Sequence, residues 1–160
     1  MYVVAMYSSA HVIDVLSRYS RRQKKDAQAA LWNAARNFGP DSITTSFVLE
    51  MVFKADAQTI AGAIGEGVNP RYGGLQADVK ELESLTIDEL KDKGVQATKG
   101  TIFRFDCSSQ GVSVFMDGNK QGVAGFGGMG IAFVDLFMDD KTVSPALIDS
   151  CLDSWCGNSL

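Results

Sequence analysis

Residues 101–125, TIFRFDCSSQGVSVFMDGNKQGVAG, decide the fold of this chain. Phe103 and Phe105 alternate with Arg104 and Asp106, and residues 111–116 alternate in the same way, as strands with one buried face do. They are followed by Asp-Gly at 117–118, a strong signal for a two-residue turn between antiparallel strands. The stretch therefore predicts three consecutive antiparallel strands, the last at residues 121–125.

Two more strands are expected toward the N-terminus. Residues 2–8 alternate weakly, whereas residues 45–54 have a clear period of two. A face with four large apolar side chains needs a cover, and a helix capped by Asp56, with Ile60 and Ile64 one turn apart, can supply it. The four residues on that face are Phe47, Leu49, Met51 and Phe53.

The remaining segments are mostly helical by the same signals. Grouped helices between strands indicate an α+β domain with a layer of helices on a largely antiparallel sheet. A chain of 160 residues suffices for one domain, here expected to span residues 1–160. The expected segments are a solvated loop at 12–25, a helix from Asp26 to Phe38, a helix at 75–82, a short helix from Thr86 to Gly94, a buried helix at 131–138, and a helix that begins at Ser144.

Composition excludes several classes of function. A net charge of −4 argues against a nucleic-acid binder, which usually carries a basic excess. Apolar runs all fall short of the roughly 18 residues that a membrane span needs. The three cysteines cannot all pair within one chain, and their spacing fits neither zinc nor a redox pair, so a reducing, intracellular compartment is expected.

The sequence gives little support for a metal site, a cofactor or a catalytic relay through histidine. His11 is the only histidine and has no nucleophile motif near it, so we expect a surface residue and no metal site. Residues 125–130 match G-x-G-x-x-G, but a hairpin precedes them where a dinucleotide fingerprint opens a parallel βαβ unit, so no cofactor is predicted. Asp135, in an apolar helix, is expected to cap a backbone group or to face water, and Asp139-Asp140 to be solvated.

The order of these elements resembles the chalcone isomerase-like family. The C-terminal third carries most of the resemblance, from the three strands through the apolar helix to the Val-Ser-Pro of residues 143–145. Residues 2–7 (YVVAMY), 47–53 and 66–71 (EGVNPR) resemble the family's early strand, its long central strand and the end of its first covering helix. The resemblance implies an open-faced antiparallel sheet covered by helices, and the chain begins after the position of the family's first strand.

The resemblance also implies where a ligand would lie. The family includes plant isomerases that close a chalcone into a flavanone, and relatives that bind fatty acids. The isomerases contact their substrate through an Arg on the strand before residue 2 and through hydroxyl residues at three positions that correspond here to Tyr2, Ile60 and Leu136. Fatty-acid-binding relatives carry a tyrosine at the Tyr2 position, where it meets the carboxylate together with the Arg.

Ring closure develops charge on oxygen and needs polar donors, which Ile60 and Leu136 do not supply. We therefore predict a non-catalytic module that binds a fatty acid or a similar apolar ligand through Tyr2, Met51, Ile60 and Leu136, in a pocket of roughly a few hundred Å³ between sheet and helix. Two alternatives stay open: a chalcone-flavanone isomerase, an intramolecular lyase, with a rearranged site, and a fragment or diverged copy without a ligand. The resemblance leaves the compartment open between plastid and cytosol, and the oligomeric state is open as well.

Overall fold

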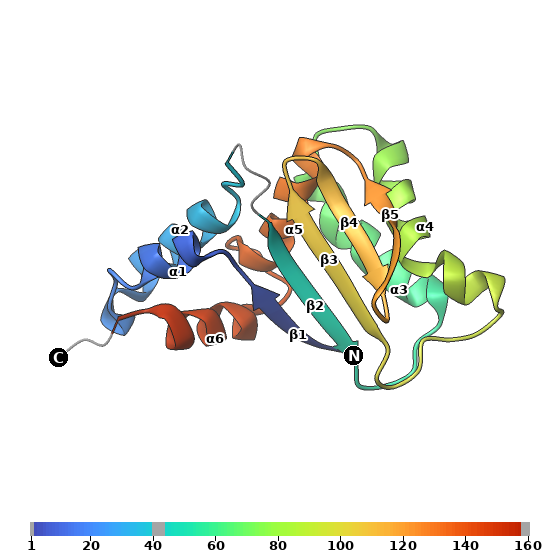
Figure 1. Cartoon of the computed structure of the whole chain (residues 1–160), viewed down its shortest axis with the longest axis horizontal. Helices are drawn as coiled ribbons and strands as arrows, with labels where there is room; N and C mark the ends of the chain where they lie inside the picture. The colour runs from blue at the N-terminus through green and yellow to red at the C-terminus, as the bar shows by residue number, and fades with distance from the viewer. Residues whose placement is uncertain (1, 40–43, 158–160) are drawn as a thin grey trace.

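Five strands pair in chain order to form one antiparallel sheet in the computed structural model, which describes residues 2–39 and 44–157 (Figure 1). The predicted hairpin is confirmed, since Asp117 and Gly118 link β4 to β5 with φ angles of 48° and 84°, the left-handed values that such a turn requires. The strands are β1 (Tyr2–Tyr7), β2 (Thr45–Met51), β3 (Ile102–Ser108), β4 (Gly111–Met116) and β5 (Asn119–Ala124).

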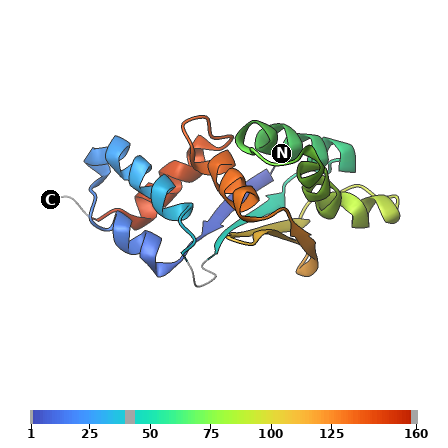
Figure 2. The same ribbon diagram turned by 90° about the horizontal axis from the view of Figure 1, so that it is seen from above.

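Within residues 2–39 and 44–157, six helices and two short 3₁₀ turns complete the fold, whose α+β class is the one that the sequence predicted. In Figure 2, α3, α4 and α5 lie on one face of the sheet, and α1, α2 and α6 gather beyond the β1 end. The opposite face of the sheet stays open toward the viewer of Figure 1. The helices are α1 (Ala10–Leu16), α2 (Lys24–Ala35), α3 (Ala57–Val68), α4 (Gln76–Asp92), α5 (Gly127–Met138) and α6 (Pro145–Trp155), with 3₁₀ turns at Arg21–Gln23 and Asn69–Arg71. Among the described residues, no helix combines the length and the apolar character that a membrane crossing requires.

The core forms where α5 lies on the middle strands. Alternation along β2 and β3 directs Phe47 and Phe105 toward the helices, where both are fully buried. On α5, Phe133 stacks on Phe105 and Phe137 stacks on Phe47, each pair with ring centroids 4.7 Å apart. Gly130 permits this approach, because a Cβ there would collide with the carbonyl oxygen of Ser108. Gly130, the last residue of the glycine-rich stretch, therefore serves close packing of helix on strand.

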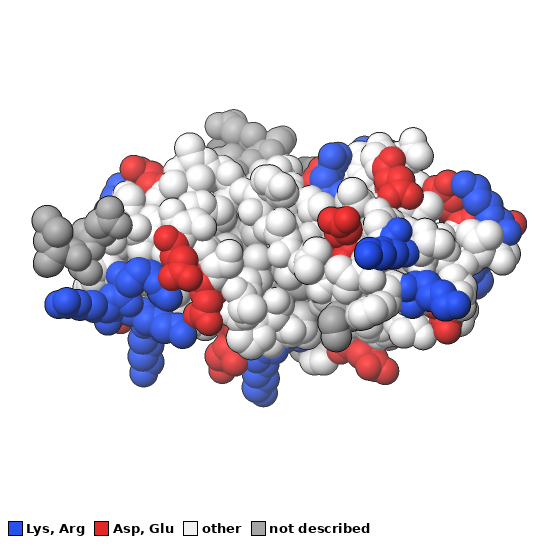
Figure 3. Space-filling model, turned by 90° about the horizontal axis from the view of Figure 1, so that it is seen from below, with Lys and Arg blue, Asp and Glu red and all other residues white. Residues whose placement is uncertain are grey.

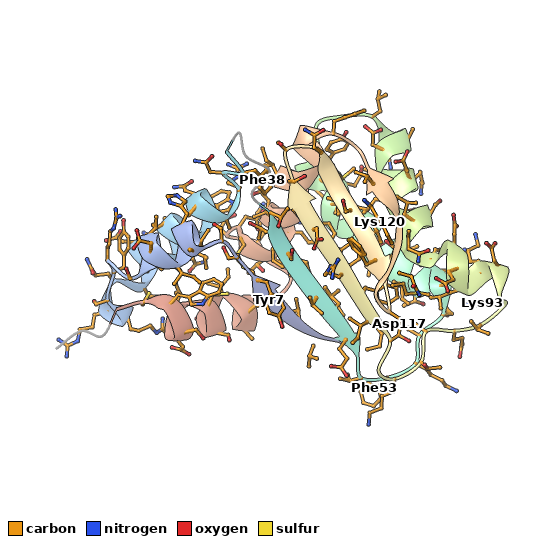
Figure 4. All side chains as sticks on the ribbon, viewed as in Figure 1. Tyr7, Phe38, Phe53, Lys93, Asp117 and Lys120 are labelled. Atoms are coloured by element: carbon orange, nitrogen blue, oxygen red, sulfur yellow. The ribbon has the colours of Figure 1, made fainter. Side chains whose placement is uncertain are left out.

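The second strand is shorter than its apolar pattern predicted. It ends at Met51, because Thr101 and Gly100 take up the main-chain N–H and C=O of that residue, and the chain then turns so that Ala55 pairs with Ala97. Phe53 is consequently 63% exposed and does not belong to the buried face. Figure 4 shows it on the loop that follows β2.

The two helices predicted between residues 75 and 94 are one helix, α4. Thr86 does not cap a new helix; it lies inside α4 and its hydroxyl donates to the carbonyl oxygen of Leu82. A continuous buried stripe, in which Val79, Leu82 and Leu90 take part, outweighs the weak helix propensity of threonine. Leu75, expected on the buried face, is 71% exposed at the start of the helix.

The N-terminal segment contains a helix that the sequence did not predict, α1, and the next helix, α2, begins two residues earlier than predicted. The expected loop at 12–25 contains α1, whose Val12 and Leu16 are buried, and a turn in which Ser20 and Gln23 form a capping box. Asp26 lies in the first turn of α2, so it does not cap the helix. The helix ends at Ala35, and Phe38 is buried from the segment beyond it.

Two aspartates expected to face water or backbone groups instead hold elements together. Asp135 on α5 accepts a hydrogen bond from Trp32 Nε1 at 2.6 Å and pairs with the Arg36 guanidinium, so it joins α5 to α2. Asp139 pairs with Arg71 at 2.8 Å, and both side chains are 14% exposed. Each arrangement stabilises the position of α5, the helix that carries the aromatic core.

Candidate ligand-binding site

A pocket of about 160 Å³ lies between α3 and the β1, β2 and β3 strands. It occupies the place where the sequence predicted a ligand pocket, although its volume is below the few hundred Å³ expected. The residues that line it are Tyr2, Leu49, Met51, Ala55, Thr59, Ile60, Ala63, Ile64, Phe103 and Phe105.

Two periodicities bring these side chains together. Leu49 and Met51 are two apart on β2, and Phe103 and Phe105 are two apart on β3, so each pair points to the helix face of the sheet. On α3, residues four apart share a face, which places Ile60 with Ile64 and Thr59 with Ala63. The last two are small and exposed, so the space that a larger side chain would fill stays open at the mouth.

The first turn of α3 is held firmly at the mouth of the pocket. Asp56 caps the helix as predicted, because its carboxylate accepts a hydrogen bond from the Thr59 N–H at 2.8 Å. That bond, from a main-chain donor to a charged acceptor, lowers the pKa of Asp56. The cap therefore fixes the helical turn that presents the Thr59 side chain.

The lining is apolar apart from two hydroxyl groups, those of Tyr2 and Thr59. Burial raises the pKa of Tyr2, so its phenol is neutral at physiological pH and can donate one hydrogen bond. Within the described part of the chain, the ten lining residues include no Asp, Glu, His, Lys or Arg. The pocket can thus hold an apolar group and meet a polar end with neutral donors.

Three of the four predicted site residues line this pocket: Tyr2, Met51 and Ile60. Leu136 does not; it is 4% exposed on α5, and its side chain lies against Gly67 of α3. Arg104 points to the open face of the sheet, where its guanidinium carbon lies 3.8 Å from the centre of the Phe115 ring, so it is not part of the pocket. Alternation explains this, because its neighbours Phe103 and Phe105 face the pocket.

Sequence reasoning placed Leu49 and Ile64 on the two surfaces that enclose the predicted cavity, and both line the pocket. It did not foresee five other lining residues: Ala55, Thr59, Ala63, Phe103 and Phe105. Helical spacing could have pointed to Ala63, three residues after the predicted Ile60, and then to Thr59, four residues before Ala63. The alternation that placed Leu49 and Met51 on one face of β2 also applies to Phe103 and Phe105, two residues apart on β3. No local signal singled out Ala55, which reaches the pocket through the turn after β2.

Comparison with known proteins supports the fold. No family model matches the sequence, and a search of curated proteins finds no match. Among solved structures, the chain is similar to a fatty-acid binding protein of Arabidopsis thaliana, with a TM-score of 0.70 and 17% sequence identity over 96% of this chain and 77% of that protein. At this identity the likeness concerns the architecture, and it agrees with the open five-stranded sheet and its layer of helices. The chain has the chalcone isomerase-like fold.

Proposed function

We propose that this protein binds the apolar chain of a fatty acid, or of a ligand with similar character, in the pocket between α3 and the sheet, without transforming it. One observation carries the proposal: a pocket whose ten lining residues offer apolar surface and only two neutral hydroxyls. Ligand sites in proteins are mostly apolar, with a few polar groups that fix orientation. The likeness in fold to a fatty-acid binding protein points in the same direction.

The volume of the pocket limits the ligand. At about 160 Å³ it is roughly half the size of the smallest typical ligand sites, and it is close to an apolar cavity of ~150 Å³ that accepts benzene. A short acyl segment would therefore lie against Met51, Ile60 and Phe103. Its polar end would remain at the mouth, within the region of the Tyr2 and Thr59 hydroxyls.

A catalytic role is less well supported. Cyclisation of a chalcone requires stabilisation of a developing oxyanion and a group that moves a proton near neutral pH. The Tyr2 phenol has a raised pKa, and Thr59 is an unactivated hydroxyl. We therefore expect purified protein to leave the rate of chalcone closure at its background value, which absorbance assays can measure.

Binding should depend on chain length in a defined way. Each buried methylene contributes about 0.8 kcal/mol, so affinity should rise about fourfold per carbon from butanoate to octanoate. Titration calorimetry of this series measures the slope. A slope near zero, or no binding at any length, would contradict the proposal.

A variant that fills the pocket gives the sharper test. Ala63→Leu places a larger side chain at the mouth and should lower octanoate affinity about tenfold or more. Ala77→Leu is the matched control, because Ala77 is also an exposed helical alanine but lies on α4, outside the lining. Equal affinities for the two variants would place the ligand elsewhere.

The hydroxyl of Tyr2 should contribute only modestly to octanoate affinity. Tyr2→Phe removes one neutral hydrogen bond and should weaken octanoate binding by at most about 1.5 kcal/mol. Since none of the described lining residues is a cation, raising the salt concentration should change affinity little. A steep decline of affinity with salt would point to a cation outside this pocket.

A further inference from the structure

A second hollow lies beside the pocket, along β1, the outer strand of the sheet within the described residues. It is a groove of about 470 Å³ between β1 and the first turns of α6. In Figure 3, which views the molecule from the side of β1 and α6, charged side chains gather at the two ends, and the middle is largely free of them. The groove is lined by Tyr2, Val3, Val4, Val143, Ser144, Ala146, Leu147 and Ser150.

Tyr2 connects the two hollows. Among the described residues it is the one that lines both the pocket and the groove. The residue is half-buried at the start of β1, where it borders both hollows. A change in the position of this single side chain would join two spaces that together fall within the roughly 300–1,000 Å³ of typical ligand sites.

The groove carries hydrogen-bonding groups beyond the two hydroxyls of the pocket. Ser144 and Ser150 contribute hydroxyls from α6. The edge of β1 contributes main-chain N–H and C=O groups. Met51 on β2 directs its N–H and C=O toward Thr101 and Gly100, so it does not bond to its partner on β1, Tyr2. By the alternation of an antiparallel pair, the N–H and C=O groups of Tyr2 and Val4 therefore point away from β2. These donors and acceptors are uncharged, as the whole described lining is, and they suit a neutral polar group or a carboxylate beside an apolar chain.

We propose that the groove is the second half of the binding site, and that Tyr2 is the partition that sets the length of the acyl chain. This inference rests on the proposed function of the pocket. With the ring in place the site accepts a short chain. With the ring displaced, a long-chain fatty acid occupies the pocket with its tail, passes the Tyr2 position and places its polar end between Ser144, Ser150 and the β1 edge.

The test compares octanoate with palmitate below its aggregation limit. Wild-type protein should bind the two acids with affinities within about threefold of each other. Tyr2→Ala removes the partition and should bind palmitate at least tenfold more tightly than octanoate. Octanoate binding by the variant also reports that it is folded. Tyr2→Ala without a gain for palmitate would overturn the inference.

A second substitution in the groove separates its role from that of the pocket. Ala146 is exposed on α6 and lines the groove but not the pocket. Tyr2→Ala with Ala146→Phe should therefore lose the preference for palmitate and bind octanoate as tightly as Tyr2→Ala does. Tyr2→Ala with Ala29→Phe is the control, because Ala29 is an exposed alanine on α2, away from both hollows. Retention of the palmitate preference in the Ala146 double variant would overturn the inference.

Two further outcomes distinguish a failure of the proposed function from a failure of this inference alone. If wild-type protein binds neither acid, the proposed function itself fails, and this inference fails with it. If sedimentation shows a dimer that Ala146→Phe dissociates, the groove receives a second copy along the β1 edge, and the ligand extension is overturned while the pocket remains.

Discussion

The helix layer covers one face of the sheet in two different ways. Under α5, the space is filled by Phe133 and Phe137, which stack on Phe105 and Phe47. Under α3, the same face meets Thr59 and Ala63, and a pocket remains. Phe105 borders both regions, so the strands cannot account for the difference. The size of the side chains on the covering helix decides whether a region is core or pocket.

The largest expected effect comes from breaking the packed region. Phe133→Ala should lower the free energy of unfolding by about 3–5 kcal/mol, since Phe133 is 1% exposed and a cavity would replace its ring. Denaturant unfolding measures the change. Phe126→Ala is the control: it is 79% exposed near the start of the same helix and should change stability by at most about 0.5 kcal/mol. A loss below ~1 kcal/mol for Phe133→Ala would show that the core relaxes around the gap.

Enlarging a small residue should lower the free energy of unfolding in the region under α5 and raise it in the region under α3. Ala132→Leu on α5 places a larger side chain where the alanine is fully buried and should destabilise by about 1–3 kcal/mol. Ala77→Leu on the exposed face of α4 controls for helix propensity. If Ala132→Leu proved neutral in thermal unfolding, α5 would be packed less tightly than its contacts indicate.

The corresponding change under α3 should be smaller and favourable. Ala63→Leu fills open space and should raise the free energy of unfolding by about 0.5–1 kcal/mol, as cavity-filling substitutions commonly do. The same unfolding measurement applies. Destabilisation similar to that of Ala132→Leu would mean that the pocket closes in solution and that the two regions do not differ.

The smallest expected effect concerns the cap that holds α3 at the pocket. The pKa of Asp56 is lower in the folded state, so its charged form contributes stability above the unfolded pKa, and this contribution is lost as pH falls through the lower folded value. Asp56→Asn keeps a capping side chain but does not titrate. Unfolding curves of wild type and variant between pH 7 and 3 should therefore differ at neutral pH and converge below about pH 4. If the two free energies of unfolding differed by the same amount at every pH, the charge of Asp56 would not contribute to the cap.

Much of the architecture follows from local patterns in the sequence. The alternation at 101–116, the Asp117-Gly118 turn and the Asp56 cap each depend on residues a few positions apart, and each is present as predicted. The apolar stretch at 131–138 likewise predicted a buried helix, because a helix that is hydrophobic all round has no face for solvent. Local spacing determines which side of an element is apolar, and that suffices for the α+β layers.

What only the tertiary structure decided depends on distant residues. Phe53 continues the strand pattern but is exposed, because Gly100 and Thr101 end the strand at Met51. Leu136 lies against Gly67 rather than in the pocket, and Asp135 finds its partners about one hundred residues away, at Trp32 and Arg36. The pocket arises in the same way, from the volumes of side chains on separate elements that the fold brings together. A pattern along the chain records which face is apolar, but not how completely the facing surface fills the space.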